Sequence, residues 1–184
     1  MQTLVVVDAQ NEFSAGGQRA VPDHGMALEA ILQRVEEARR EERPIAWVRH
    51  YNTPEENAGR ASPAFVPGTW GAEFSPGLGP LADRAEEREF VKTVYGAFTG
   101  TDVGSWLESV GSDEVLIVGF YTHMCVSTTA REALMRGLSV SVDPDGTGAT
   151  AISHELLGSL SAEEVRRSAL LQLNHMGVEI TPRG

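Results

Sequence analysis

Cysteine is nearly absent from this 184-residue sequence, which holds a single one at position 125. One cysteine cannot form an internal disulfide or a cysteine-based zinc cluster, so neither can stabilise the fold. A single thiol is typical of proteins kept in a reducing compartment. We therefore expect the protein in the cytoplasm.

Long hydrophobic runs and positive charge are also scarce. The longest apolar runs are short, such as residues 4–7, whereas a membrane-spanning helix needs about 20 apolar residues. The N-terminus lacks the pattern of a signal peptide. Fifteen Lys and Arg against 26 Asp and Glu give a net charge of −11. We therefore expect no membrane partner and no nucleic-acid partner, since both require a positive surface.

Several common catalytic motifs are missing as well. The sequence contains no glycine-rich nucleotide-binding loop and no G-x-S-x-G turn for a serine nucleophile. His154 and Glu155 begin a zinc-protease motif, but Gly158 stands where its second histidine belongs. The sequence therefore gives no support for a nucleotide cofactor, a serine hydrolase or this type of zinc enzyme.

Strand-like and helix-like segments alternate along the chain, and their spacing predicts one α/β domain over residues 1–184. Short apolar runs are typical of buried parallel strands, and apolar residues at helical spacing separate them. We expect strands over residues 3–8, 45–49, 89–92, 114–120, 138–143 and 178–181. We expect helices from the cap Asp23 to Pro44, from the cap Thr101 to Val110, from Cys125 to Arg136, and from the Ser161–Glu164 capping box to about Met176. Such alternation predicts a parallel sheet with helices on both faces.

Residues 50–87 break this rhythm. The segment has no clean period, holds five of the nine prolines, and contains Phe65, Trp70 and Phe74. Long loops inside compact domains are usually functional or disordered, and the aromatic residues argue against disorder. We expect a surface insertion with its own small apolar cluster, a lid or wall of a pocket, or an arm that packs on another subunit.

Three reactive side chains fall where predicted strands end. Asp8 closes the first strand, Lys92 closes the third, and Cys125 follows the fourth. Ligands of open parallel sheets bind at this edge, and a helix N-terminus and a nearby ammonium both favour a reactive thiolate. A carboxylate can accept the thiol proton. Each residue also has an ordinary structural interpretation: a small buried cysteine, a helix-capping aspartate and a solvated lysine.

The residues around these three resemble the isochorismatase-like cysteine hydrolase superfamily. The resemblance runs from Thr3 to about Gly177 and rests on three segments. They are Asp8-Ala9-Gln10-Asn11-Glu12-Phe13, Lys92 with Tyr95 and Phe98, and the block Val118-Gly119-Phe120-Tyr121-Thr122-His123-Met124-Cys125-Val126-Ser127-Thr128-Thr129-Ala130. The last block is the most specific.

This resemblance implies a catalytic triad of Asp8, Lys92 and Cys125. It also implies a cis peptide bond between Phe120 and Tyr121, and an oxyanion hole formed by the amides of Tyr121 and Cys125. The implied fold is a Rossmann-like, three-layer α/β/α arrangement with a six-stranded parallel sheet. Family members are commonly dimers or tetramers, so the resemblance implies a homodimer or higher homo-oligomer.

Two departures from the family pattern bear on the chemistry. Metal-dependent nicotinamidases carry Asp-x-His after the second strand, where this chain has Arg49-His50-Tyr51, and no further histidine occurs before His123. We therefore expect no metal and no other cofactor. The Tyr121-x-His123 pair is similar to true isochorismatases, which cleave a vinyl ether and have glycine at the position of Cys125.

With a thiol present, acyl transfer fits better. We predict a hydrolase of a small amide, carbamoyl or related acyl substrate, with pocket walls from Phe13, His50, Trp70, Phe98 and Tyr121. Two alternatives remain. One is a vinyl-ether hydrolase in which Arg49 or His50 binds a carboxylate and Cys125 is incidental. The other is a noncatalytic family member.

Overall fold

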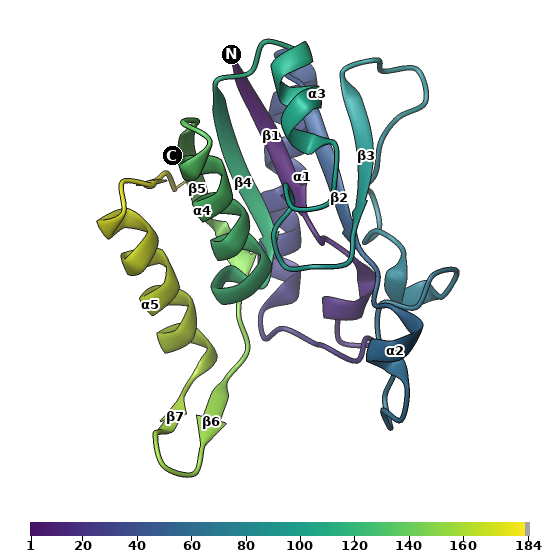
Figure 1. Cartoon of the computed structure of the whole chain (residues 1–184), viewed down its shortest axis with the longest axis vertical. Helices are drawn as coiled ribbons and strands as arrows, with labels where there is room; N and C mark the ends of the chain where they lie inside the picture. The colour runs from purple at the N-terminus through teal and green to yellow at the C-terminus, as the bar shows by residue number, and fades with distance from the viewer. Residues whose placement is uncertain (183–184) are drawn as a thin grey trace.

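A single parallel sheet organises the computed structural model, which describes residues 1–182. The strands follow the spatial order β3-β2-β1-β4-β5-β8, and every neighbouring pair is parallel (Figure 1). They are β1 (Gln2–Val7), β2 (Ile45–His50), β3 (Glu87–Lys92), β4 (Glu114–Phe120), β5 (Ser139–Gly148) and β8 (Glu179–Ile180). The order reverses beside β1, so the crevice at the carboxyl ends of β1 and β4 is the expected ligand site.

Helices cover both faces of this sheet. The helix α1 (His24–Arg40) packs on one face, and α3 (Val103–Ser109), α4 (Ser127–Met135) and α5 (Ala162–His175) pack on the other. The three-layer α/β/α arrangement with a six-stranded parallel sheet is thereby confirmed. Among residues 1–182, none of the helices has the length and apolar character needed to cross a membrane.

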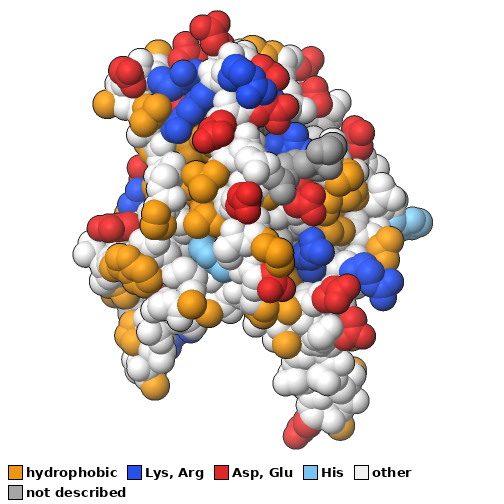
Figure 2. Space-filling model, turned by 180° about the vertical axis from the view of Figure 1, so that it is seen from behind, with side chains coloured by type: hydrophobic (Ala, Val, Ile, Leu, Met, Phe, Trp, Pro, Cys, Tyr) orange, Lys and Arg blue, Asp and Glu red, His pale blue; other side chains and the backbone are white. Residues whose placement is uncertain are grey.

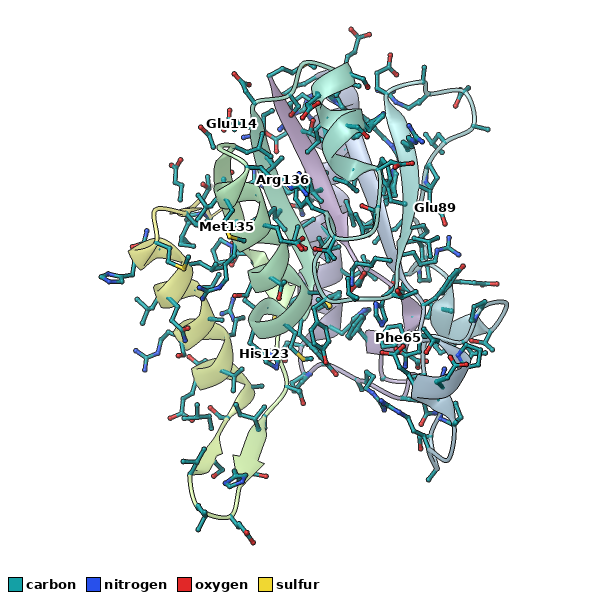
Figure 3. The ribbon with its side chains drawn as sticks, viewed as in Figure 1. Phe65, Glu89, Glu114, His123, Met135 and Arg136 are labelled. Carbon is teal, nitrogen blue, oxygen red and sulfur yellow. The ribbon has the colours of Figure 1, made fainter. Side chains whose placement is uncertain are left out.

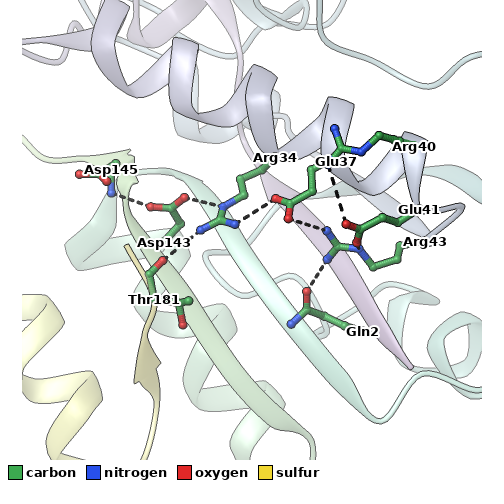
Figure 4. Close-up of polar contacts among 9 residues, drawn as sticks. All are labelled: Gln2, Arg34, Glu37, Arg40, Glu41, Arg43, Asp143, Asp145 and Thr181. Carbon is green, nitrogen blue, oxygen red and sulfur yellow. Dashed lines mark hydrogen bonds and ion pairs between the residues drawn. The ribbon is translucent and has the colours of Figure 1, made fainter. Parts of the chain in front are cut away.

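A network of charged side chains connects α1 to the edge of the sheet formed by β5 and β8. Arg34 bonds the buried carboxylate of Asp143 at 2.7 Å, Glu37 at 3.0 Å and the carbonyl of Thr181 at 3.2 Å (Figure 4). One guanidinium therefore joins α1, the middle of β5 and the segment after β8. Because Asp143 is fully buried, removing Arg34 would leave a carboxylate without its partner.

Several element boundaries differ from the sequence-based expectations. Asp23 precedes α1 but has a left-handed backbone and makes no side-chain cap. Asp102, not Thr101, occupies the N-cap position of α3, although the Thr101 hydroxyl accepts a bond from Val103 at 3.3 Å. The Ser161–Glu164 capping box is confirmed. The strand expected at residues 138–143 continues as β5 to Gly148, because pairing with β4 resumes after a bulge.

A projecting hairpin follows β5 and has no counterpart among the sequence-based expectations. Its strands β6 (Ile152–His154) and β7 (Gly158–Leu160) pair antiparallel and are exposed throughout. Leu156 and Leu157 at its tip are 83% and 86% exposed. Seen from behind, the hairpin forms one of two lobes that extend from the same end of the molecule with a hollow between them (Figure 2).

Residues 50–87 fold against their own chain. The segment contains the short helices α2 (Pro54–Asn57) and η2 (Trp70–Ala72), and packs on η1 (Asn11–Phe13). Glu12 accepts a bond from the Phe65 amide at 2.9 Å, and Asn11 donates to the Trp70 carbonyl at 2.9 Å. Phe65 and Phe74 join the apolar cluster on the α1 face. The segment is thus an apolar surface insertion that also walls the site described next.

Candidate active site

Asp8 lies directly after β1 at the carboxyl edge of the sheet. Its backbone has a φ of 52°, a left-handed conformation that non-glycine residues rarely adopt. Its amide donates to the Val48 carbonyl at 2.8 Å, and its own carbonyl accepts from Gln10 at 2.7 Å. This tight turn holds the carboxylate under the rim, where its side chain is only 1% exposed. Neither carboxylate oxygen is bonded by a backbone amide within residues 1–182.

Lys92, the last residue of β3, supplies the counter-charge. Its Nζ lies 2.7 Å from Oδ2 of Asp8, and both side chains are buried. The same ammonium donates to the carbonyl of Val94 at 3.0 Å. Burial alone would lower the pKa of Lys92, but the charge of Asp8 outweighs it and raises the pKa. Lys92 therefore stays charged, and the pair is a buried ion pair.

Cys125 is placed by a single π-helical turn, η3 (Thr122–Val126), that precedes α4. The carbonyl of Tyr121 closes this turn by accepting bonds from Met124 at 3.1 Å and Val126 at 3.2 Å. The helix expected to begin at Cys125 thus begins two residues later, because the wider turn comes first. Single π-turns of this kind often mark functional sites. The peptide bond between Phe120 and Tyr121 is cis, at the position that the resemblance implied.

The surroundings of Cys125 keep its thiol protonated. Burial raises the pKa of the thiol far above its ordinary value, and the neighbouring carboxylate of Asp8 raises it further. The ammonium of Lys92 opposes both effects without overcoming them. The expectation of a thiolate favoured by the helix start and the ammonium is therefore wrong for this state. Desolvation dominates because the side chain is only 7% exposed.

His50, at the end of β2, extends this buried network. Its Nδ1 lies 3.3 Å from Nζ of Lys92, and its Nε2 lies 2.9 Å from Oδ1 of Asn52. The ammonium donates to Nδ1, so the ring proton sits on Nε2 and points at the amide oxygen. Burial and the charge of Lys92 lower the pKa of His50. The imidazole is therefore neutral and orients Lys92 without competing for Asp8.

Gln10 connects the strand ends behind these residues. It is fully buried, donates to the carbonyls of His50 at 3.0 Å and Ala72 at 2.8 Å, and accepts from the His50 amide at 2.8 Å. One side chain thus ties the end of β2 to the turn after β1 and to the 50–87 segment. Its place two residues after Asp8 is visible in the sequence, but its partners become apparent only in the fold.

A cavity of about 330 Å³ opens onto the thiol and the carboxylate. Phe13, Phe65 and Tyr121 form an aromatic wall, with Phe13 packed edge-on to Tyr121 at 4.8 Å between ring centroids. Phe65 lies at the carboxyl end of the sheet, as does His123 (Figure 3). The remaining lining consists of Asp8, Arg19, His50, Asn52, Glu56, Arg60, Thr93, Val94, Tyr95, Met124 and Cys125. A cavity of this size admits a small molecule.

Phe13, His50 and Tyr121 line the cavity as expected, but Trp70 and Phe98 do not. Trp70 is 53% exposed on the outer surface. Phe98 is buried in the core on the α3–α4 face, where Arg136 stacks on its ring at 5.1 Å. The expectation was wrong for both residues. It rested on their aromatic character, whereas their positions depend on the direction in which each loop turns.

Arg49 also lies outside the cavity lining. Its guanidinium pairs with Glu89 at 3.3 Å and stacks on Phe74 at 4.3 Å. Successive residues of a strand point to opposite faces, so Arg49 and His50 cannot share one pocket. The alternative in which Arg49 binds a carboxylate in this cavity is therefore wrong.

Sequence reasoning missed the polar mouth of the cavity. Asn52, Glu56 and Arg60 come from the insertion, and Arg19 comes from the loop after η1. Neither segment has a periodic pattern that would orient its side chains. The only available signal was the composition of residues 50–87, which favoured a wall but named no polar residue.

Comparison with models of known protein families identifies the family of this chain. The model of the isochorismatase domain matches residues 2–183. The chain belongs to the isochorismatase family. Membership makes it a hydrolase.

Its curated relatives in the isochorismatase family differ in their named activities. The chain is 31% identical to a nicotinamidase/pyrazinamidase of Mycobacterium tuberculosis, over 94% of this chain and 98% of that protein. It is 33% identical to a streptothricin hydrolase of Streptomyces noursei, over 79% of this chain and 53% of that protein.

Solved structures of the family share the whole fold. An isochorismatase from Pseudomonas putida superposes with a TM-score of 0.87 at 25% identity, covering 98% of this chain and 87% of that one. A pyrazinamidase of Pyrococcus horikoshii in complex with zinc superposes with a TM-score of 0.80 at 25% identity, covering 99% of both chains.

The residues around His50 do not fit a catalytic zinc ion. Both ring nitrogens of His50 are engaged, and one of them faces the ammonium of Lys92, which would repel a cation. Asn52 offers a neutral oxygen instead of a carboxylate. Residues 1–182 contain no group of three or more His, Cys, Asp or Glu placed to hold a metal. The donor set therefore falls short of the three protein ligands that catalytic zinc sites use.

Proposed function

We propose that this chain hydrolyses a small amide, carbamoyl or related acyl compound through a thioester on Cys125. The observation that carries the proposal is the buried cluster of Asp8, Lys92 and Cys125, in which Asp8 and Cys125 line one small cavity. A thiol, a carboxylate and a fixed cation in contact are the components of nucleophilic catalysis with proton transfer.

In the first half-reaction, Asp8 takes the thiol proton as Cys125 attacks the carbonyl carbon. The raised pKa of the thiol means that this proton leaves only when the sulfur is forming its bond to carbon. The new carbon–sulfur bond creates a tetrahedral oxyanion. Asp8 then returns the proton to the leaving nitrogen, the carbon–nitrogen bond breaks, and the thioester remains.

We assign the amide of Tyr121 to the oxyanion hole together with the amide of Cys125. Tyr121 lines the cavity, and its amide has no hydrogen-bond acceptor within residues 1–182, which supports this assignment. Preorganised amides of this kind are worth roughly 10²–10³-fold in rate.

In the second half-reaction, water attacks the thioester and gives its proton to Asp8. The carbon–sulfur bond breaks, the acid product leaves and the thiolate recovers the proton. Lys92 holds the side chain of Asp8 in place between the two half-reactions, and His50 holds Lys92 in place.

We also propose that the chain acts as a homodimer or higher homo-oligomer in a reducing cytoplasm. The exposed Leu156 and Leu157 of the β6–β7 hairpin support self-association. A reducing compartment would keep the catalytic thiol free.

The test is a panel of small primary amides and N-carbamoyl compounds, with isochorismate included, assayed with the native chain and with Cys125→Ala. We expect hydrolysis of at least one acyl compound and a loss of several orders of magnitude in the variant. Mass spectrometry of acid-quenched enzyme should show one acyl group on Cys125. Ser127→Ala, which keeps the thiol, serves as the control.

Two outcomes would overturn the proposal. Turnover of isochorismate that survives Cys125→Ala would show vinyl-ether chemistry with an incidental thiol. Turnover of an amide that survives the same change would exclude the thioester.

A further inference from the structure

Two arginines at the cavity mouth have no carboxylate partner. Arg19 and Arg60 both line the cavity, and neither forms an ion pair within residues 1–182. The one hydrogen bond of the Arg19 guanidinium in this part of the chain goes to the adjacent carbonyl of Gln18, at 2.9 Å. Arg34 and Arg39, in contrast, are each paired with a buried carboxylate.

The other charged groups of the lining do not cancel these two cations. The carboxylate of Asp8 is already matched by Lys92 at 2.7 Å. Glu56 accepts the Thr53 amide at 2.7 Å in the capping box of α2 and is the one further carboxylate of the lining. His50 is neutral. The cavity therefore keeps a net positive charge in a chain whose net charge is −11.

The two arginines enter from separate segments. Arg19 lies in the loop after η1, and its backbone carbonyl accepts a bond from the Tyr121 hydroxyl at 2.7 Å. This contact fixes the loop against the aromatic wall. Arg60 lies in the insertion, just after α2. Guanidinium groups bind carboxylates in a two-pronged manner, and two of them that reach one mouth define an anion subsite.

We propose that Arg19 and Arg60 bind a carboxylate at the non-reacting end of the substrate. This inference rests on the proposed function and narrows its substrate class to small amides or carbamoyl compounds that carry a carboxylate, such as N-carbamoyl amino acids. The acyl carbon lies at Cys125, the body of the substrate packs on Phe13 and Phe65, and the carboxylate meets the two guanidiniums. A neutral amide of the same shape leaves both cations unmatched.

Binding to the Cys125→Ala chain tests the subsite without any turnover. Calorimetry would compare a series of small N-carbamoyl amino acids with their neutral carboxamides. We expect each anion to bind at least about tenfold more tightly than its matched carboxamide, since hydrogen bonds to charged groups are stronger than those between neutral groups. The preference should fall several-fold when Arg19→Gln or Arg60→Gln is added.

Arg167→Gln is the matched control. Arg167 lies on α5, outside this cavity, and it also lacks an ion pair within residues 1–182, so its loss lowers the net charge equally and should leave the preference unchanged. Equal affinity for the anions and the carboxamides, or no binding of either, would overturn the subsite.

The proposed subsite would also be overturned if Arg167→Gln reduced the preference for anions over carboxamides as much as Arg19→Gln or Arg60→Gln does. A chain that hydrolyses only neutral amides would retain the proposed function and lose this inference. A chain that binds the anions as expected but hydrolyses no acyl compound would do the reverse.

Discussion

At the scale of single residues, the site depends on how two opposite charges and one thiol share an environment that excludes water. Asp8 and Lys92 are a buried pair, and a buried pair is stable only while both members are present. Cys125 adjoins this pair but remains protonated, because burial penalises a thiolate more than the ammonium rewards it. The reactivity of the thiol therefore depends on the base beside it, and not on a preformed thiolate.

Substitutions in the Asp8–Lys92 pair should affect stability and activity differently. Lys92→Met should lower the free energy of unfolding by about 3–5 kcal/mol, because it leaves a buried carboxylate without its partner. Adding Asp8→Asn should recover much of that loss while activity stays abolished. Urea denaturation and turnover measured on the same preparations check both parts. A double variant as unstable as Lys92→Met would show that the pair does not act as a unit.

The surroundings of His50 predict that the enzyme works without a metal ion. Both ring nitrogens are engaged and a cation already occupies the adjacent position, so a second cation would be repelled. Exhaustive chelation followed by dialysis should leave turnover unchanged. Loss of turnover on chelation, with recovery on adding zinc, iron or manganese, would contradict this description of the site.

At the scale of the elements, the ends of β1 and β4 must approach closely to bring Asp8 and Cys125 together. Gly119 makes this possible. Its φ is +125°, and a Cβ at this position would lie 1.8 Å from the Val7 carbonyl oxygen. No side chain can be accommodated without moving β1, and with it the turn that holds Asp8. The glycine is thus part of the framework of the site.

Gly119→Ala should therefore lower stability far more than an ordinary surface substitution and should impair the site. We expect a loss of more than about 3 kcal/mol, beyond the range of typical single substitutions. Gly25→Ala is the control, because Gly25 lies in α1 with open space around its Cα and alanine favours helices by up to about 1 kcal/mol. Thermal unfolding that ranks the two variants in the opposite order would refute the explanation.

At the scale of the whole molecule, the two lobes at the carboxyl end of the sheet differ in their contacts. The 50–87 insertion is bonded to η1 and walls the cavity, whereas the β6–β7 hairpin extends away from its own chain. The hairpin exposes four apolar side chains close together in sequence, Ile152, Leu156, Leu157 and Leu160. It is therefore the stronger candidate for contact with another subunit.

Light scattering at micromolar concentration should give a mass of at least twice 19.8 kDa. Replacing Leu156 and Leu157 together with serine should lower the mass toward that of one chain, because their apolar surface would no longer favour association. Met135→Ser, which removes an apolar residue that is 79% exposed elsewhere, is the control. A monomeric native chain would remove the proposal of self-association.

Local sequence signals were sufficient to predict the layered fold and the three residues at its carboxyl edge. Apolar runs and helical spacing are local signals, and parallel strands bring their ends to one edge whatever the loops do. Three properties became apparent only in the folded chain: Trp70 lies outside the cavity, Arg19 and Arg60 line its mouth, and the thiol of Cys125 stays protonated. These properties depend on how aperiodic segments turn and on how much water the finished packing excludes, and neither is encoded in the spacing of residues along the chain.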